Sequence, residues 1–230
     1  MKEENVQYFE NVMGFYVEPA DVADAPGVVM IHEAWGLNEN IKNYARKLAG
    51  EGYRVLAVDM FGEIFDSDIN SAADDATRQK VFAKIQGIDQ DKATANLRAA
   101  VGFLRQRGAK KVGSIGWCFG GAQSLQLAVS GEKMDATVIY YGRLFTDADK
   151  LSKITWPVLG IFAALDAHIT PAMVKDFETA LKSLHVTNEI IIYPNVNHAF
   201  ANPTGQNFSP TESADAWIKT IRFFKENLKG

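Results

Sequence analysis

The chain has 230 residues, of which 47% are hydrophobic, and it carries a formal net charge of −4 at pH 7. This length and apolar content suffice to bury one sizeable core, so we expect a single domain spanning residues 1–230. The charge is only mildly negative and no run of Lys or Arg occurs, which argues against nucleic acid or an anionic membrane surface as a partner.

Cysteine usage and the first residues bear on the compartment. The only cysteine is Cys118, so an intrachain disulfide is excluded, and a reducing environment fits. Residues 1–5 lack the apolar segment of a signal peptide, and no apolar run is long enough to span a bilayer. We therefore expect a soluble cytoplasmic protein. The sequence leaves open whether it is a monomer or a small homo-oligomer.

Apolar runs alternate with helical patterns along the chain. Residues 15–18 are expected to add an antiparallel edge strand, and residues 61–86 to lie over the functional site as a loop and a helix. The other expected strands are continuous apolar runs, typical of strands buried on both faces, at residues 27–32, 54–58, 111–115, 136–140, 158–163 and 189–193. Helical spacing recurs around 41–48, 97–104, 170–184 and 209–228. This alternation predicts an α/β fold: an open, mostly parallel sheet with helices on both faces.

A short motif follows the strand expected at 111–115. It reads Gly116-Trp117-Cys118-Phe119-Gly120, which is the G-x-S-x-G nucleophile elbow of the α/β-hydrolase fold with sulfur in place of oxygen. A lone cysteine is more often an inert buried side chain than a nucleophile. The flanking glycines and the preceding strand outweigh that interpretation here, because a tight strand-to-helix turn needs them. We therefore predict that Cys118 is a nucleophile.

Polar groups follow other expected strands, where functional groups of an open α/β sheet gather. Asp166 comes after the strand at 158–163, and His198 comes after the strand at 189–193. Nucleophile, acid and histidine then appear in the chain order that this fold uses. We expect His198 to take the thiol proton and Asp166 to fix the tautomer of His198 and stabilise its imidazolium.

The remaining histidines, and Asp59, have structural interpretations. His32 ends a buried strand and is expected to make a hydrogen bond there, and His168 is expected at the rim of the site. His185 lies near the end of a predicted helix, where a histidine suits the helix dipole. Asp59 also ends a strand, but it precedes the nucleophile, against the order of the fold. The histidine spacings give no zinc motif, and the glycines around Cys118 fit no nucleotide-binding motif.

Two backbone N–H groups are expected to form an oxyanion hole. One is that of Phe119, directly after the nucleophile, and the other is that of Ala34, in the loop after the first long strand. Aromatic residues near the strand ends predict an apolar pocket, for which Trp35 and Phe200 are the preferred lining residues. Trp117 has a structural interpretation, because aromatic residues more often belong to the core.

These residues resemble the dienelactone hydrolase family through nearly the whole chain. The segments that carry the resemblance are His32-Glu33-Ala34-Trp35-Gly36-Leu37, Gly116-Trp117-Cys118-Phe119-Gly120-Gly121, Tyr140-Tyr141-Gly142, and Tyr193 through His198-Ala199-Phe200. The resemblance implies an α/β-hydrolase fold and a triad of Cys118, His198 and Asp166. It also implies hydrolysis of small carboxylic esters or lactones, with no cofactor and no metal.

The resemblance also implies a catalytic role for Glu33. A carboxylate close to the thiol accepts its S–H bond and opposes premature ionisation, because like charges repel. Cys118 would then rest as a neutral thiol held by Glu33 until substrate displaces the contact. The family binds a substrate carboxylate with arginines, one of them a few residues past the histidine, where this chain reads Ala-Asn-Pro-Thr at 201–204. Arg78 and Arg143 remain as candidates, and dienelactone itself is not the expected substrate.

Other functions remain open at this point. A thioesterase or amidohydrolase would use the same groups, although amides should react slowly because amines are poor leaving groups. A binding protein with a vestigial triad is the non-enzyme alternative. The complete set of Cys118, His198, Asp166 and Glu33 argues against it, because ligand binding needs none of that geometry.

Overall fold

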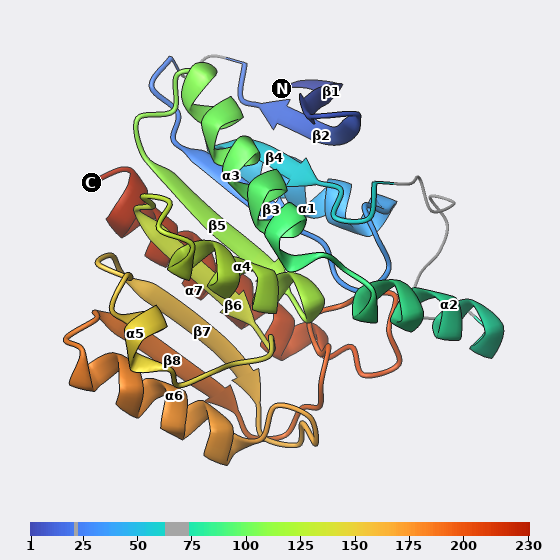
Figure 1. Cartoon of the computed structure of the whole chain (residues 1–230), viewed down its shortest axis with the longest axis vertical. Helices are drawn as coiled ribbons and strands as arrows, with labels where there is room; N and C mark the ends of the chain where they lie inside the picture. Colours follow the sequence, from blue (N-terminus) through green and yellow to red (C-terminus); the bar gives the residue numbers. More distant parts are fainter. Residues whose placement is uncertain (21–22, 63–73) are drawn as a thin grey trace.

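The computed structural model describes residues 1–20, 23–62 and 74–230, and its strands form one eight-stranded sheet (Figure 1). Their order across the sheet is β1-β2-β4-β3-β5-β6-β7-β8. Strands β3 to β8 run parallel, whereas β1 and β2 join by antiparallel pairing. The bounds are β1 Lys2–Phe9, β2 Val12–Glu18, β3 Gly27–Ile31, β4 Arg54–Val58, β5 Val112–Trp117, β6 Ala136–Tyr140, β7 Val158–Ala163 and β8 Asn188–Tyr193.

The continuous apolar runs of the sequence became the central strands. Every residue of β3, β4, β5, β6 and β7 is buried, as expected for strands covered on both faces. The six strands predicted from these runs are confirmed, with ends that differ by no more than two residues. The predicted α/β class, with a mostly parallel sheet, is also confirmed.

The N-terminal part of the sheet differs from the prediction. Residues 15–18 belong to β2, which is antiparallel as expected, but β2 is not an edge strand because β1 pairs along its outer side. The prediction missed β1 because its sequence, KEENVQYF, carries few apolar residues, and only Val6 is buried. An edge strand exposed to water needs no apolar alternation, so β1 left no clear signal in the sequence.

Helices cover both faces of the sheet (Figure 1). Helices α1 and α7 pack on one face, and α3, α4 and α6 pack on the other. In α1 the buried positions include Ile41, Tyr44 and Leu48, which share one face at helical spacing. The bounds are α1 Glu39–Gly50, α2 Asp75–Gln86, α3 Gln90–Gln106, α4 Phe119–Val129, α5 Ala148–Leu151, α6 Pro171–Ser183 and α7 Pro210–Leu228. In the described part of the chain, none of the helices combines the length and apolarity that crossing a membrane requires.

The stretch expected to lie over the site is described only in part. Residues 63–73 lie outside the described residues, and the described remainder includes α2. Of the residues of α2, only Val81 is buried. Figure 1 shows this helix extending away from the side of the molecule. The described part of the stretch therefore packs loosely on the body.

Candidate active site

The turn from β5 into α4 has the geometry of a nucleophile elbow. Cys118 lies between the two elements with φ +53° and ψ −112°, a region that residues with a side chain rarely occupy. A Cβ at Gly116 would overlap the carbonyl oxygen of Gly120, and a Cβ at Gly120 would overlap that of Ile31. The turn therefore requires glycine at both places. Backbone strain of this kind costs on the order of 1–3 kcal/mol and is typical of functional sites.

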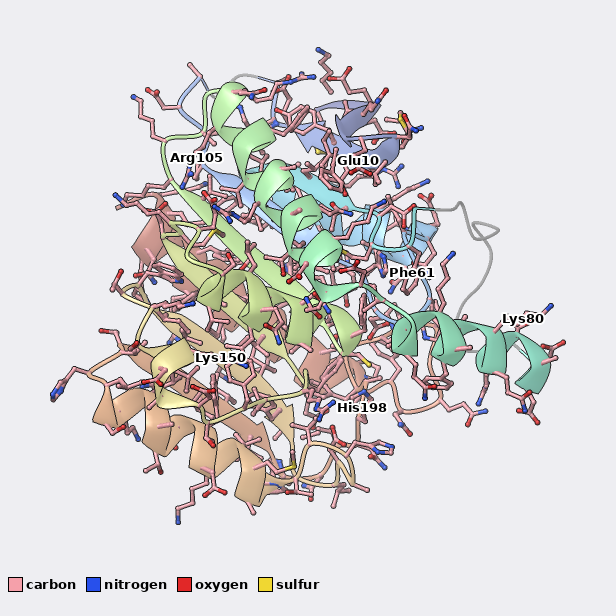
Figure 2. The ribbon with its side chains drawn as sticks, in the orientation of Figure 1. Glu10, Phe61, Lys80, Arg105, Lys150 and His198 are labelled. Carbon is pink, nitrogen blue, oxygen red and sulfur yellow. The ribbon has the colours of Figure 1, made fainter. Side chains whose placement is uncertain are left out.

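Three side chains from different strand ends meet at this elbow. The Sγ atom of Cys118 lies 3.2 Å from Nε2 of His198. On the other side of the ring, Nδ1 of His198 lies 2.6 Å from Oδ2 of Asp166. Asp166 follows β7 and His198 follows β8, and these strands are parallel neighbours, so their carboxyl ends bring the two residues together. Figure 2 shows His198 at this end of the sheet.

The carboxylate of Asp166 is held rigidly. Its side chain is fully buried, and Oδ1 accepts the backbone N–H groups of His168 at 2.8 Å and Ile169 at 3.0 Å. Burial opposes its charge, but the hydrogen bonds from His198 and from these two N–H groups lower the pKa of Asp166 below its ordinary value. A fixed, ionised Asp166 therefore sets the tautomer and the orientation of the His198 ring.

The electrostatics of His198 favour an imidazolium. Burial disfavours its charge, but the hydrogen bond to Asp166 and the contact with Cys118 raise the pKa of His198 to about 10. A protonated imidazole 3.2 Å from sulfur stabilises negative charge on that sulfur. The arrangement therefore suits a thiolate–imidazolium pair.

A second carboxylate, that of Glu33, lies buried beside the triad. Its Oε1 accepts a hydrogen bond from the hydroxyl of Tyr141 at 3.3 Å, and its Oε2 accepts one from the side-chain amide of Asn202. Burial raises the pKa of Glu33 to about 7, against the opposing influence of His198 and of both donors. The hydrogen bond of the Cys118 sulfur runs to His198, not to Glu33. This conformation differs from the resting state expected above, in which Glu33 holds the thiol.

Sequence reasoning missed Tyr141 and Asn202 as members of the site. Tyr141 is fully buried with φ +35°, and its ring centroid lies 5.2 Å from that of His198. Asn202 is 2% exposed, and its Oδ1 accepts the backbone N–H of Thr204 at 2.9 Å, which directs the amide nitrogen to Glu33. Asn202 stands within the 201–204 stretch where the resemblance led us to seek an arginine. A buried polar side chain at this place is the signal that sequence reasoning overlooked.

The two expected oxyanion donors lie next to the elbow. Phe119 is the first residue of α4, so its backbone N–H has no acceptor within the helix. Strand β3 pairs with β5, with Ile31 opposite Gly116, so the segment after β3 that carries Ala34 runs beside Cys118. Ala34 itself is buried. Both donors stay predictions, and their placement suits that role.

His32 and Asp59 have structural contacts. The ring of His32 is fully buried, and its Nδ1 lies 2.5 Å from the carbonyl oxygen of Glu33. Its Nε2 accepts the backbone N–H of Met60 at 3.0 Å, so the ring is neutral, and burial lowers the pKa of His32. Asp59 accepts the backbone N–H of Phe61 at 2.8 Å. His32 thus joins the loops after β3 and β4, and Asp59 shapes its own loop.

The model of the dienelactone hydrolase family matches residues 12–228. The chain belongs to this family. A protein of Saccharolobus solfataricus that is provisionally named a carboxymethylenebutenolidase is 30% identical over 234 residues, covering 88% of this chain and 90% of that protein. This chain of the dienelactone hydrolase family is accordingly a hydrolase of carboxylic esters or lactones.

Solved structures show the same fold. A Klebsiella pneumoniae protein, provisionally titled a dienelactone hydrolase, superposes with a TM-score of 0.86 at 24% identity, covering 98% of both chains. A dienelactone hydrolase-like promiscuous phosphotriesterase from metagenomic libraries superposes with a TM-score of 0.79 at 27% identity, again covering 98% of both chains. The fold of this family member therefore extends along almost the whole chain.

The aromatic residues considered for the pocket of this family member differ in their exposure. Trp35 is partly exposed, as a lining residue requires. Phe200 is 0% exposed, and its ring packs against Tyr141 at 5.6 Å, so it supports the site from behind and presents no surface to a substrate. Trp117 is buried and packs against Tyr44, in keeping with its structural interpretation.

The two arginines proposed to bind a carboxylate lie on different elements. Arg78 is half-buried on α2, and Arg143 is exposed just after β6. No group of three or more His, Cys, Asp or Glu side chains that could hold a metal ion occurs among the described residues.

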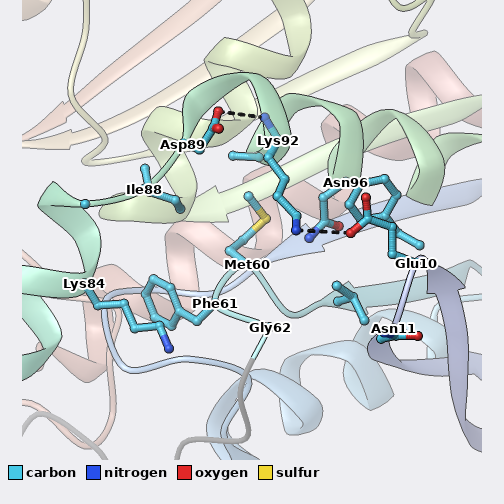
Figure 3. A pocket seen from close by; sticks show the side chains of 14 residues that line it. Glu10, Asn11, Met60, Phe61, Gly62, Lys84, Ile88, Asp89, Lys92 and Asn96 are labelled. Carbon is cyan, nitrogen blue, oxygen red and sulfur yellow. Dashed lines mark hydrogen bonds and ion pairs between the residues drawn. The ribbon is translucent and has the colours of Figure 1, made fainter.

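A cavity of about 390 Å³ lies away from the triad (Figure 3). It opens between the β1–β2 hairpin and the start of α3, and an ion pair of 3.1 Å joins Lys92 and Glu10 at its wall. Phe61 lines this cavity and also stacks on Phe119, with ring centroids 5.5 Å apart. Phe61 therefore lies between the cavity and the nucleophile elbow.

Proposed function

We propose that this chain hydrolyses small carboxylic esters and lactones through a triad of Cys118, His198 and Asp166 and a thioester acyl-enzyme. One observation carries the proposal: the sulfur lies at a strained elbow 3.2 Å from His198 Nε2, with Asp166 2.6 Å behind the ring. A buried structural cysteine requires neither a strained backbone nor an imidazole with its own carboxylate.

The reaction divides into two acyl transfers. The sulfur of Cys118 attacks the carbonyl carbon, and its proton passes to His198 Nε2. The N–H groups of Phe119 and Ala34 stabilise the oxyanion, and His198 then protonates the departing alkoxide. In the second half, His198 removes a proton from water, which attacks the thioester and releases the acid. With a lactone, the alkoxide stays attached to the acyl group, so the product is a single hydroxy acid or its tautomer.

Glu33 is proposed to influence the ionisation of this pair. Its carboxylate is buried and interacts with the charge of His198, so its protonation changes the field at the sulfur. A negative Glu33 opposes a thiolate and favours an imidazolium. If Glu33 acts in this way, the pH dependence of Cys118 alkylation will differ between the wild type and Glu33→Gln. An identical alkylation profile in the two proteins would remove this role.

We also propose that substrates are small molecules and that Trp35 contacts them. Arg78 and Arg143 are the proposed contacts for any substrate carboxylate, and the reduced lone thiol supports a cytoplasmic location. Thioesters remain within reach of the same triad. A direct comparison of matched oxygen esters and thioesters would show which class has the higher kcat/KM.

Burst kinetics with p-nitrophenyl acetate test the triad. The wild type is expected to release a burst of nitrophenolate and to show an acetyl adduct on Cys118 by intact mass and peptide mapping. Cys118→Ala is expected to lose both, whereas a matched exposed variant, His185→Ala, keeps both, because His185 lies just beyond the C-terminal end of α6, away from the elbow. Turnover by Cys118→Ala at the wild-type rate would refute the proposal.

A further inference from the structure

The two edges of the sheet differ in how they are protected. At one edge, β1 carries Glu3 and Glu4, which pair with Arg46 at 2.8 Å and Arg107 at 2.9 Å, and its pairing with β2 contains an irregularity near Phe9. Charges and bulges on an edge strand prevent it from pairing with another chain. The edge formed by β1 is therefore closed to association.

The opposite edge is less protected, because β8 has one charged residue, Glu189, and its pairing with β7 is regular. Strand β8 carries three isoleucines in a row, at 190, 191 and 192, and among the described residues no strand pairs along its outer side. Ile192, the last of the three isoleucines, is 36% exposed, so part of this apolar run faces the solvent. Figure 1 shows β8 at the border of the sheet beside α6. A β-branched edge with unpaired outward backbone groups and a single charged residue, Glu189, is a template for another strand.

Helix α7 adds exposed apolar surface next to this edge. The hydroxyl of Tyr193 donates to Asp215 at 2.6 Å, and Arg222 pairs with Glu189 at 2.6 Å. These two contacts lay α7 alongside β8. Ile218 lies between Asp215 and Arg222 on the same helix face, and it is 66% exposed. An exposed isoleucine thus lies level with the middle of the open strand.

A two-fold rotation brings opposite charges on either side of Ile218 together between two copies of the chain. Asp215 stands one turn before Ile218 and Arg222 one turn after it, so an axis beside Ile218 places Asp215 of each copy next to Arg222 of the other. In the strand, the same rotation about Ile191 places Glu189 opposite Tyr193. The ammonium of Lys219 lies 3.3 Å from the Tyr193 hydroxyl, so Glu189 would meet a positive charge.

From this pattern we infer that β8 pairs antiparallel with β8 of a second copy of this chain, which gives a two-fold homodimer with Ile218 beside its axis. A second copy of this chain provides both an Arg222 opposite Asp215 and an Asp215 opposite Arg222. A strand from an unrelated protein would not carry this arrangement of charges. Pairing satisfies the outward backbone groups of β8 and covers Ile218 and Ile192. The dimer also anchors Tyr193, five residues before His198.

Mass measurement in solution tests the dimer. Light scattering at micromolar concentration is expected to give twice the 25.4 kDa of one chain. Ile218→Asp places two like charges beside the axis, so it is expected to give the mass of one chain with an unchanged far-UV circular dichroism spectrum. Phe82→Asp, a control at a residue 55% exposed on α2, is expected to stay dimeric. A monomeric wild type, or a dimer that Ile218→Asp leaves intact, overturns the proposal.

Cross-linking gives a readout that does not depend on weakening the dimer. In a Cys118→Ser background, Ile218→Cys is expected to form a disulfide between copies under an added oxidant, because the axis brings the two cysteines face to face. Phe82→Cys in the same background is the matched control and should stay uncrosslinked. If the two variants cross-link equally, or neither does, the axis does not lie beside Ile218 and the proposed pairing is wrong.

Discussion

Asp166 and Glu33 are two buried carboxylates that act on one imidazole, and their pKa values are shifted in opposite directions. Asp166 accepts two backbone N–H groups in addition to His198, and these donors overcome the effect of burial and lower its pKa. Glu33 has two side-chain donors, and burial nevertheless raises its pKa to about 7. The two pKa values differ because the direct hydrogen bond from His198 and the backbone donors outweigh burial at Asp166, whereas burial outweighs the donors at Glu33.

Removing the charge of Asp166 is expected to have the largest effect. Asp166→Asn favours the wrong tautomer of His198, so we expect kcat for p-nitrophenyl acetate to fall on the order of 10⁴-fold. Steady-state kinetics measure the loss. Asp176→Asn, an exposed acid on α6, is the matched control and should leave kcat unchanged. A loss below tenfold would mean that Asp166 does not orient the ring.

The charge of Glu33 should appear in the pH dependence of stability. Its folded pKa of about 7 exceeds the ordinary value of 4.5, so the folded state binds more protons between these values. The stabilisation is therefore full below about pH 4.5 and is lost as the pH rises through 7. At 1.36 kcal/mol per pKa unit, the loss reaches at most about 3 kcal/mol by pH 8.

Glu33→Gln removes this titration. Denaturant unfolding at pH 5 and pH 8 is expected to show a smaller decrease in the free energy of unfolding for the variant than for the wild type. Glu226→Gln, an exposed substitution near the end of α7, should behave as the wild type. Equal decreases in the wild type and Glu33→Gln would show that Glu33 titrates at an ordinary pH.

The hydroxyl of Tyr141 is one of the two donors to Glu33. Tyr141→Phe keeps the ring that packs on Phe200 but removes the hydroxyl that stabilises the charged form of Glu33. The pKa of Glu33 should rise by about one unit, since a hydrogen bond to a charged group is worth about 1.5–3 kcal/mol and this one is long. NMR of the labelled carboxyl carbon measures it. Tyr53→Phe is the control, because the Tyr53 hydroxyl has no partner among the described residues. An unchanged titration midpoint of Glu33 would contradict a stabilising hydrogen bond from Tyr141.

The smallest effect is expected at the exposed arginine. Arg143→Ala should change kcat/KM for neutral esters by less than about twofold, as surface substitutions usually do. For esters with a free carboxylate, whose charge a negative Glu33 repels, the loss should reach about fivefold, the upper range for an exposed ion pair. Arg78→Ala is the parallel variant. Equal changes for both ester classes would remove Arg143 from substrate binding.

The sequence predicted the triad residues more readily than their surroundings. Cys118, Asp166 and His198 could be proposed because chain order and the ends of apolar strands place them at one edge of a parallel sheet. The environment of Glu33 could not, because its donors, Tyr141 and Asn202, are 108 and 169 residues away along the chain. Their approach depends on loop conformations, including the positive φ of Tyr141, that no local pattern reveals.

The same limit applies to the sheet. Buried strands were found because burial demands continuous apolar residues, as in β5. Strand β1 has only one buried residue, Val6, and is defined by its register with β2, a property of two segments together. Strands that are buried in the core can therefore be predicted from the sequence. A strand that is defined only by pairing with a neighbour, such as β1, cannot.

The neutral ring of His32 has a consequence for acid tolerance. Because its Nε2 accepts the N–H of Met60, adding a proton there replaces an attraction with two facing donors. Burial keeps the pKa of His32 below 6.5, so an unfolded chain takes up this proton before the folded one does. Mild acid therefore favours separation of the loops after β3 and β4, which His32 joins. One of them carries Ala34, so mild acid is expected to displace this proposed oxyanion donor before it alters the nucleophile itself.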